Sequence, residues 1–118
     1  MYNYLLVFIG GGIGSIFRYG IAQSLSHYNF PPYATFVANA LSCILLGFLV
    51  GLSLKSALDQ QYKLLLMTGV CGGFSTFSTF TNETFALFQN GEISYALANI
   101  VGSVLVCLAC IYLGMKMA

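Results

Sequence analysis

The sequence predicts an all-α membrane protein with four transmembrane helices, and three observations agree on this fold class. Hydrophobic residues make up 58% of the 118 residues and charged residues only 6%, whereas charged residues make up about 25% of a soluble domain. Each transmembrane helix needs roughly 20 apolar residues, so four spans joined by short loops account for the chain. The third observation is a run of glycine, hydroxyl and phenylalanine residues at positions 69–83, inside an apolar segment. We therefore expect one four-helix transmembrane domain over residues 1–118.

The first predicted span covers residues 4–25 and contains closely spaced glycines. No Lys or Arg precedes Arg18, so the segment is a poor match to a cleaved signal peptide, and we expect a permanent span. Gly10 and Gly14 are four residues apart, which lets another helix approach closely. Arg18 follows this glycine face near the far end of the span. It is either an anchor at the membrane interface or a positive charge at the mouth of an anion pathway.

The second predicted span covers residues 33–54 and follows a loop at residues 27–32. Asn39 and Ser42 share one face of this otherwise apolar helix. The Asn39 side-chain amide offers two donors and an acceptor. It either bonds a neighbouring helix or donates a hydrogen bond to a passing anion.

The third predicted span covers residues 64–89, and we expect it to be broken near residues 72–75. Irregular backbone is tolerated at membrane depth only where protein or a water-filled cavity surrounds it, and such breaks are where ions bind. Around the helix axis, one arc carries the polar side chains of Ser75, Ser78, Thr79 and Asn82. The neighbouring arc carries the phenylalanines at 74, 77, 85 and 88, with the one at 80 on the opposite flank. Ring edges and hydroxyl donors can replace part of the hydration shell of a small anion, whereas bare carbonyls suit a cation.

Glu83 lies in the same apolar segment and has two interpretations. It is either a helix-end carboxylate held by neighbouring hydroxyl groups or a group that couples transport to protons.

The fourth predicted span covers residues 93–115 and carries one weakly polar stripe, which could face the polar arc of the third span. The stripe consists of Asn99, Ser103, Cys107 and Cys110, at spacings of four, four and three. The last two form a C-x-x-C, which is a candidate metal site or redox pair. We favour small buried residues instead, because every cysteine of the chain falls within a predicted span and no second pair supports the motif.

The charges are few and weakly biased. The net charge of +1 gives no basic patch for a nucleic acid. In a four-span chain Lys55, Lys63 and Lys116 lie on the side of both termini, while Arg18 alone lies near the other side. This bias only weakly favours one orientation, so insertion in both orientations is plausible on charge alone.

The motifs together resemble the family of small bacterial fluoride channels (Fluc, or CrcB). The resemblance is carried by the run GVCGGFSTFSTF at residues 69–80, by the glycine-rich first span ending in Arg18, and by Asn39 in the second span. It covers the whole chain. Two departures stand out: Ser42 occupies a position where the family often has glycine, and Cys107 one where some members have a hydroxyl.

The resemblance implies an antiparallel, dual-topology homodimer in the inner (plasma) membrane, with two fluoride pathways at the dimer interface. It implies a structural Na⁺ at the interface, held by backbone carbonyls that match Gly72 and Ser75. Arg18 would be a vestibule residue, with Glu83 and Cys107 as accessory residues. The residues that it assigns to the pore are Asn39, Phe77, Ser78, Thr79, Phe80 and Ser103.

The function that the resemblance implies is passive, fluoride-selective export that confers fluoride resistance, and no enzyme activity. Its partners would be a second copy of the chain, the fluoride ion and the lipid bilayer. One alternative is a small multidrug-type, proton-coupled transporter, which needs a carboxylate in the first span, where this chain has none. The other alternative is a non-transporting membrane subunit, which would not need a broken third span.

Overall fold

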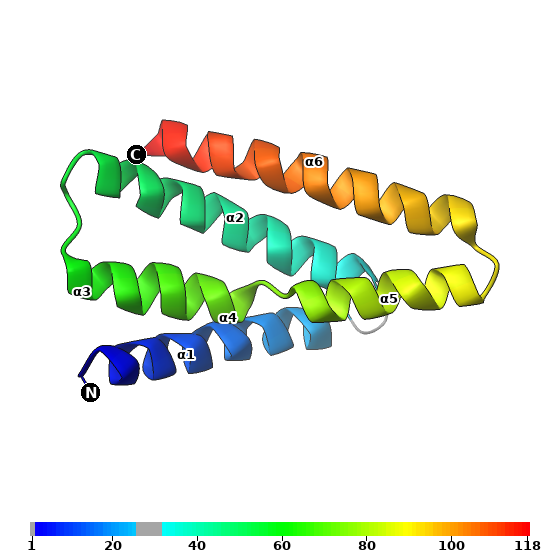
Figure 1. Cartoon of the computed structure of the whole chain (residues 1–118), viewed down its shortest axis with the longest axis horizontal. Coiled ribbons are helices and arrows are strands. Elements are labelled where there is room, and N and C mark those ends of the chain that lie inside the picture. Colours follow the sequence, from blue (N-terminus) through cyan, green and yellow to red (C-terminus); the bar gives the residue numbers. More distant parts are fainter. Residues whose placement is uncertain (1, 26–31) are drawn as a thin grey trace.

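The computed structural model describes residues 2–25 and 32–118, and its secondary structure within these ranges is helical (Figure 1). Four of its helical segments are long and apolar enough to cross a membrane: Tyr2–Ser24, Tyr33–Leu54, Gln60–Gln89 and Ile93–Met117. The prediction of an all-α protein with four membrane-spanning segments is therefore confirmed. Of the predicted first loop, residues 27–31 lie outside the described ranges.

Three of the four segments contain a single long helix each. These helices are α1 (Tyr2–Ser24), α2 (Pro32–Leu54) and α6 (Ile93–Met117). Both ends of the described chain and the turn between α2 and the third segment lie at one end of the molecule, and the turn into α6 lies at the other (Figure 1). Gly91 makes this last turn with a positive φ of 79°, a conformation that glycine adopts without steric cost.

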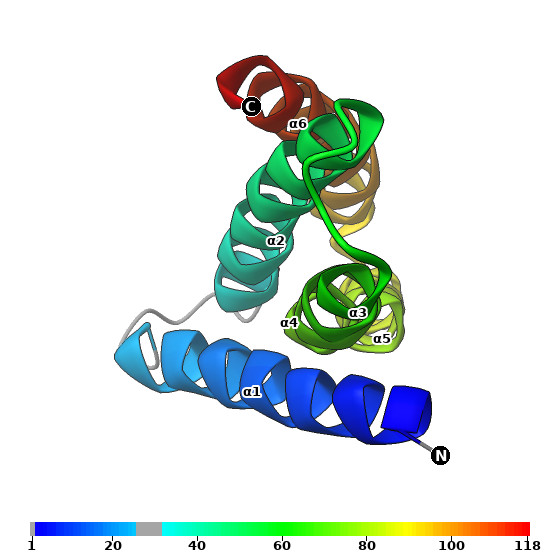
Figure 2. The same ribbon diagram turned by 90° about the vertical axis from the view of Figure 1, so that its left-hand side faces the viewer.

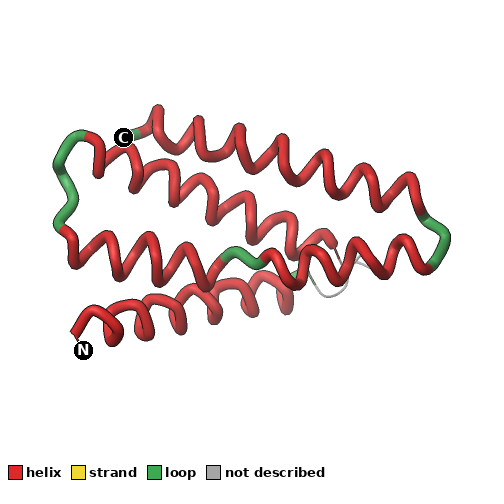
Figure 3. The backbone as a smooth tube through the Cα atoms, viewed as in Figure 1, coloured by secondary structure: helices red, strands yellow, loops and turns green. Residues whose placement is uncertain are grey.

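The third segment is assembled from four helical pieces. It consists of α3 (Gln60–Tyr62), the π-helix η1 (Lys63–Cys71), α4 (Gly72–Phe74) and α5 (Phe77–Gln89). Between α4 and α5 the backbone is extended at Ser75 (φ −89°, ψ 157°) and Thr76 (φ −150°, ψ 126°), which Figure 3 shows as a short connection within the segment. The nine-residue π-helix was not predicted from the sequence; this form is rare and usually limited to one turn.

Glycine allows α2 and α6 to run side by side in the same direction (Figure 1). A Cβ added at Gly47 would overlap the carbonyl oxygen of Ile111, and one added at Gly114 would overlap that of Ile44. Gly47 therefore lies opposite Ile111. The same register places Cys43 of α2 opposite Cys107 of α6, one helical turn earlier on each helix.

A second glycine contact holds α1 against the third segment, which α1 crosses as Figure 2 shows. A Cβ on Gly10 would overlap the Leu65 carbonyl oxygen, and one on Gly14 would overlap the Val70 carbonyl oxygen. The predicted close approach at Gly10 and Gly14 is confirmed. It fixes the middle of α1 beside η1 and α4.

Candidate functional site

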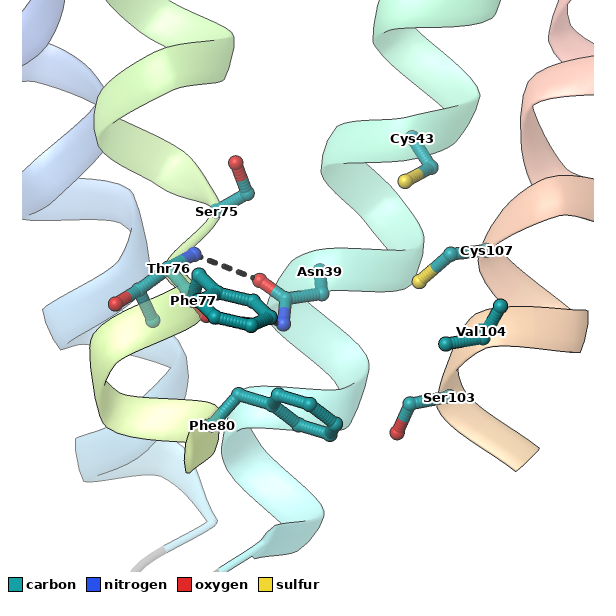
Figure 4. Close-up of a pocket in the computed structure, with 9 residues that line it drawn as sticks. All are labelled: Asn39, Cys43, Ser75, Thr76, Phe77, Phe80, Ser103, Val104 and Cys107. Carbon is teal, nitrogen blue, oxygen red and sulfur yellow. Dashed lines mark hydrogen bonds between the residues drawn. The ribbon is translucent and has the colours of Figure 1, made fainter. Parts of the chain in front are cut away.

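The extended residues between α4 and α5 are stabilised by a side chain of α2. The Asn39 amide bonds both backbone groups of Thr76: Oδ1 accepts from Thr76 N at 2.9 Å, and Nδ2 donates to Thr76 O at 3.3 Å (Figure 4). An unpaired backbone group in an apolar environment would cost several kcal/mol. Asn39 therefore makes extended backbone tolerable at this depth, and one of its two amide hydrogens is left for another acceptor.

Carbonyl groups of η1 and α4, just before the extended residues, accept hydrogen bonds from three side chains. Cys71 O accepts from Ser75 N at 3.1 Å, from Ser75 Oγ at 2.9 Å and from Ser42 Oγ at 3.1 Å. Gly73 O accepts from Arg18 Nε at 3.1 Å. The structure thus places the Arg18 guanidinium, half-buried, on the end of α4. Anchoring at the membrane interface is therefore not the only role open to Arg18, because its side chain also contacts the third segment.

The Thr76 hydroxyl begins α5. Thr76 Oγ1 accepts from Thr79 N at 3.2 Å, a hydroxyl cap of the kind that satisfies a free amide in a first helical turn. The hydroxyls of Ser78 and Thr79 each lie 3.3 Å from Thr76 Oγ1. Ser78 and Thr79 therefore gather around Thr76, and neither lines the cavity beside it.

A cavity of about 250 Å³ lies between α2, α5 and α6, beside the extended residues. All nine residues of the described chain that line it are uncharged (Figure 4). They are Asn39, Cys43, Ser75, Thr76, Phe77, Phe80, Ser103, Val104 and Cys107. The cavity thus combines a few polar atoms with an apolar wall.

The aromatic wall of the cavity comes from the first turn of α5. The Phe77 and Phe80 ring centroids are 5.9 Å apart with the planes tilted by 42°, so sequence positions predicted to lie on different flanks share one cavity. Phe77 is 76% exposed in the single chain. The ring of Phe77 therefore lines the cavity, while most of its surface remains exposed in the single chain.

A line of hydrogen bonds leads away from the cavity along α6 and α5. Ser103 Oγ donates to Asn99 Oδ1 at 3.4 Å, Asn99 Nδ2 donates to Thr84 Oγ1 at 2.9 Å, and Thr84 Oγ1 donates to Phe80 O at 2.8 Å. The polar stripe of the fourth span does face the third span. Its contact there is Thr84, however, and not the predicted arc of Ser75, Ser78, Thr79 and Asn82.

Glu83 lies on α5, away from the cavity lining. Thr35 of α2 is a neighbouring hydroxyl residue, and a carboxylate held by hydroxyl groups stays a prediction. Its Oε1 is buried and has no hydrogen-bond partner among the described residues. Glu83 therefore keeps a free acceptor atom inside the bundle.

The structure brings together most of the residues that the resemblance assigns to the pore. Asn39, Phe77, Phe80, Ser103 and the accessory Cys107 line one cavity. Neither Thr76 nor Cys43 was among the site residues predicted from the sequence. The signals were present for both: Thr76 is a hydroxyl residue ahead of a helical run, and Cys43 follows Asn39 by one helical turn.

The comparisons with known proteins cover nearly the whole chain. The family described as "CrcB-like protein, Camphor Resistance (CrcB)" matches residues 5–115. The chain is 44% identical to the fluoride-specific ion channel FluC of Pyrococcus horikoshii, covering 96% of this chain and 93% of the relative. It is 42% identical to the protein of that name from Thermus thermophilus (99% and 95% covered) and 39% identical to the one from Phocaeicola vulgatus (100% and 99% covered).

Proposed function

The chain belongs to the CrcB-like protein family, and from this premise we propose that it is a fluoride-selective ion channel of the plasma membrane. The observation that carries the proposal is the near-full-length similarity to proteins named fluoride-specific ion channels. An interior-negative membrane potential drives the anion out of the cell. Each charge that crosses 100 mV releases about 2.3 kcal/mol, so export needs no chemical fuel and confers resistance to fluoride.

The cavity beside Ser75 and Thr76 supports a path for a small, partly dehydrated anion. Asn39 retains an amide hydrogen after bonding Thr76, and the edges of the Phe77 and Phe80 rings carry partial positive charge. These groups offer weak, neutral donors in place of water. Weak binding is what conduction requires, because an ion must leave the site as readily as it enters.

Five further residues belong to this proposal. Ser103 extends the path along α6 through its bond to Asn99, and Cys107 lines the same cavity as an accessory residue. Ser78 and Thr79 support the path indirectly, through Thr76. Arg18 is its vestibule residue: the positive charge attracts anions while Nε holds the end of α4.

We propose that two chains form an antiparallel homodimer, inserted in both orientations. The Phe77 ring, 76% exposed on one chain, would then be covered by the second copy. A groove on α1 that includes Gly11, Gly12 and Ser15 offers a further uncovered surface of small residues, which suits close helix contact. The weak charge bias of the chain suits dual orientation.

A structural Na⁺ held by the backbone carbonyls of Gly72 and Ser75 fits the broken third span. In a continuous α-helix these carbonyls would accept from the amides of Thr76 and Thr79. Those amides donate instead to Asn39 Oδ1 and Thr76 Oγ1. Oxygen ligands suit a hard cation, and a bound Na⁺ would supply positive charge that ties the two copies together.

The test is ion efflux from liposomes that contain the purified protein, followed with fluoride and chloride electrodes in parallel. We expect fast release of fluoride and retention of chloride. Comparable release of both ions would contradict the proposed selectivity for fluoride over chloride. Retention of both ions would point to a non-transporting membrane subunit.

A further inference from the structure

Two cysteines from different helices lie in the wall of the candidate cavity. Cys43 of α2 and Cys107 of α6 both line it, and both are free and half-buried. In Figure 4 both sulfur atoms lie in the space between α2 and α6.

The juxtaposition is a consequence of helix register. The glycine contacts at Gly47 and Gly114 fix α2 and α6 close together and in parallel. Cys43 and Cys107 each lie one turn before the Gly47–Ile111 contact, on helices that glycine holds rigidly. The backbone positions of Cys43 and Cys107 are therefore held opposite each other, and each sulfur atom can move only by rotation about its own χ1.

From this geometry we infer that Cys43 and Cys107 form a two-thiolate binding site for a soft divalent metal ion of the Hg²⁺ type. Thiolates prefer soft metals, and a metal must displace the thiol protons to bind them. Binding breaks two S–H bonds, forms two metal–sulfur bonds and releases two protons, with no change in oxidation state.

Ligand number and charge select the metal. Within residues 2–25 and 32–118, no group of three or more His, Cys, Asp or Glu side chains could hold a metal ion, which disfavours Zn²⁺ with its four tetrahedral ligands. Hg²⁺ accepts two sulfur ligands in a line. Two thiolates also neutralise it fully, whereas Ag⁺ or Cu⁺ would leave a net negative charge in an apolar environment, where charge is costly.

The other two cysteines serve as controls. Cys71 and Cys110 are buried, with 3% and 8% of their surface exposed, and neither lines the cavity. Cys110 is also the partner of Cys107 in the C-x-x-C motif. A site made by the motif would therefore need Cys110, whereas a site made by helix register needs Cys43.

The first experiment measures binding on the purified protein with one equivalent of Hg²⁺ per chain. X-ray absorption at the mercury edge is expected to show two sulfur ligands in the unmodified protein, in Cys71→Ala and in Cys110→Ala. Cys43→Ala and the closely isosteric Cys43→Ser are expected to show fewer than two. A single sulfur ligand in the unmodified protein, or loss of the second one in Cys110→Ala, would overturn the inference.

The second experiment measures the consequence for transport, and this part rests on the proposed channel function. Because a metal held at the cavity wall narrows it, Hg²⁺ is expected to stop fluoride efflux, and excess dithiothreitol to restore it. Loss of one of two linked ligands should raise the half-inhibiting Hg²⁺ concentration roughly 100-fold in Cys43→Ala, with each variant compared with its own efflux before Hg²⁺. Equal inhibition by Zn²⁺ would contradict the site.

The two readouts separate the two proposals. If no fluoride leaves the liposomes before Hg²⁺ is added, the channel function fails, and the sulfur count alone decides the metal site. If efflux is present but the mercury has one sulfur ligand, the metal site fails and the channel function stands.

Discussion

Asn39 is the residue that allows backbone to leave the helix between α4 and α5. Its amide bonds both the N–H and the carbonyl of Thr76, so one side chain serves two backbone groups at a depth where water cannot. Few other side chains carry a donor and an acceptor that can do this. The same amide faces the cavity, which couples the stability of the extended residues to the chemistry of the site.

Replacement of Asn39 should cost more stability than replacement of its neighbour Ser42. Asn39→Leu leaves the Thr76 N–H without a partner, for about 1–3 kcal/mol, and removes a second bond worth about 1 kcal/mol. We expect the free energy of unfolding in mixed detergent micelles to fall by about 2–4 kcal/mol. Ser42→Ala is the control: the Cys71 carbonyl keeps both donors from Ser75, so its loss should stay near 1 kcal/mol. Equal losses in the two variants would contradict the role of Asn39.

The rings of Phe77 and Phe80 should matter for conduction and little for assembly. Phe77→Ile or Phe80→Ile replaces a polarised ring edge by an aliphatic group in the cavity wall. We expect fluoride efflux to fall by roughly tenfold or more, which is about 1.4 kcal/mol in the barrier, with the dimer intact in native mass spectrometry. Phe85→Ile is the matched control, because Phe85 is also exposed on α5 but does not line the cavity. Unchanged efflux in both cavity variants would exclude these rings from the path.

At the scale of the elements, glycine determines how closely the helices approach. Gly47 and Gly114 bring α2 to α6, and Gly10 and Gly14 bring α1 to the third segment. Within a membrane, apolar side chains gain little by leaving lipid, so close contact between backbones is a principal source of helix association. Side chains from two different helices then reach neighbouring residues of the third segment: Asn39 of α2 bonds Thr76, and Arg18 of α1 bonds Gly73.

Two glycines of α1 should respond oppositely to alanine. A Cβ at Gly14 would overlap the Val70 carbonyl oxygen, whereas Gly20 has open space around it. We expect Gly14→Ala to lower the free energy of unfolding by about 1–3 kcal/mol through overpacking. Gly20→Ala should leave it unchanged or raise it by up to about 1 kcal/mol, since alanine is the better helix former. Similar effects at both positions would mean that α1 does not depend on this contact.

At the scale of the whole molecule, one chain leaves its candidate site partly open. The described chain measures 47 × 29 × 22 Å, and large apolar side chains such as Phe8, Phe77 and Tyr4 are at least 76% exposed on it. Lipid can cover such side chains. The Phe77 ring, however, borders a cavity with polar atoms, and a second copy would separate that cavity from lipid.

Sodium should hold the proposed dimer together. Purified protein should have twice the 12.7 kDa mass of one chain, and exchange of Na⁺ for a large organic cation should dissociate the dimer and reduce fluoride efflux. The carbonyls of Gly72 and Ser75 would then lose the ion that compensates their missing amide partners. Return of Na⁺, but not of the organic cation, should restore both properties. Full activity and an intact dimer after rigorous Na⁺ removal would argue against the sodium site.

By itself, the sequence determined the all-α class, the four membrane-spanning segments and the glycine contacts of α1. These properties follow from hydrophobicity and residue size along a single helix, which are local. The run at residues 69–83 also contains the two phenylalanines and the hydroxyls that the structure places beside the cavity.

Only the tertiary structure decided which helices supply the partners. The relative register of different helices decides that Asn39 bonds Thr76, that Arg18 bonds Gly73 and that Asn99 bonds Thr84. It also decides that Cys43 and Cys107 line the same cavity. That register is set by backbone contacts at a few glycines. No periodicity within one helix specifies the rotation and shift of its neighbour, and this is the physical reason that these pairs were not predicted.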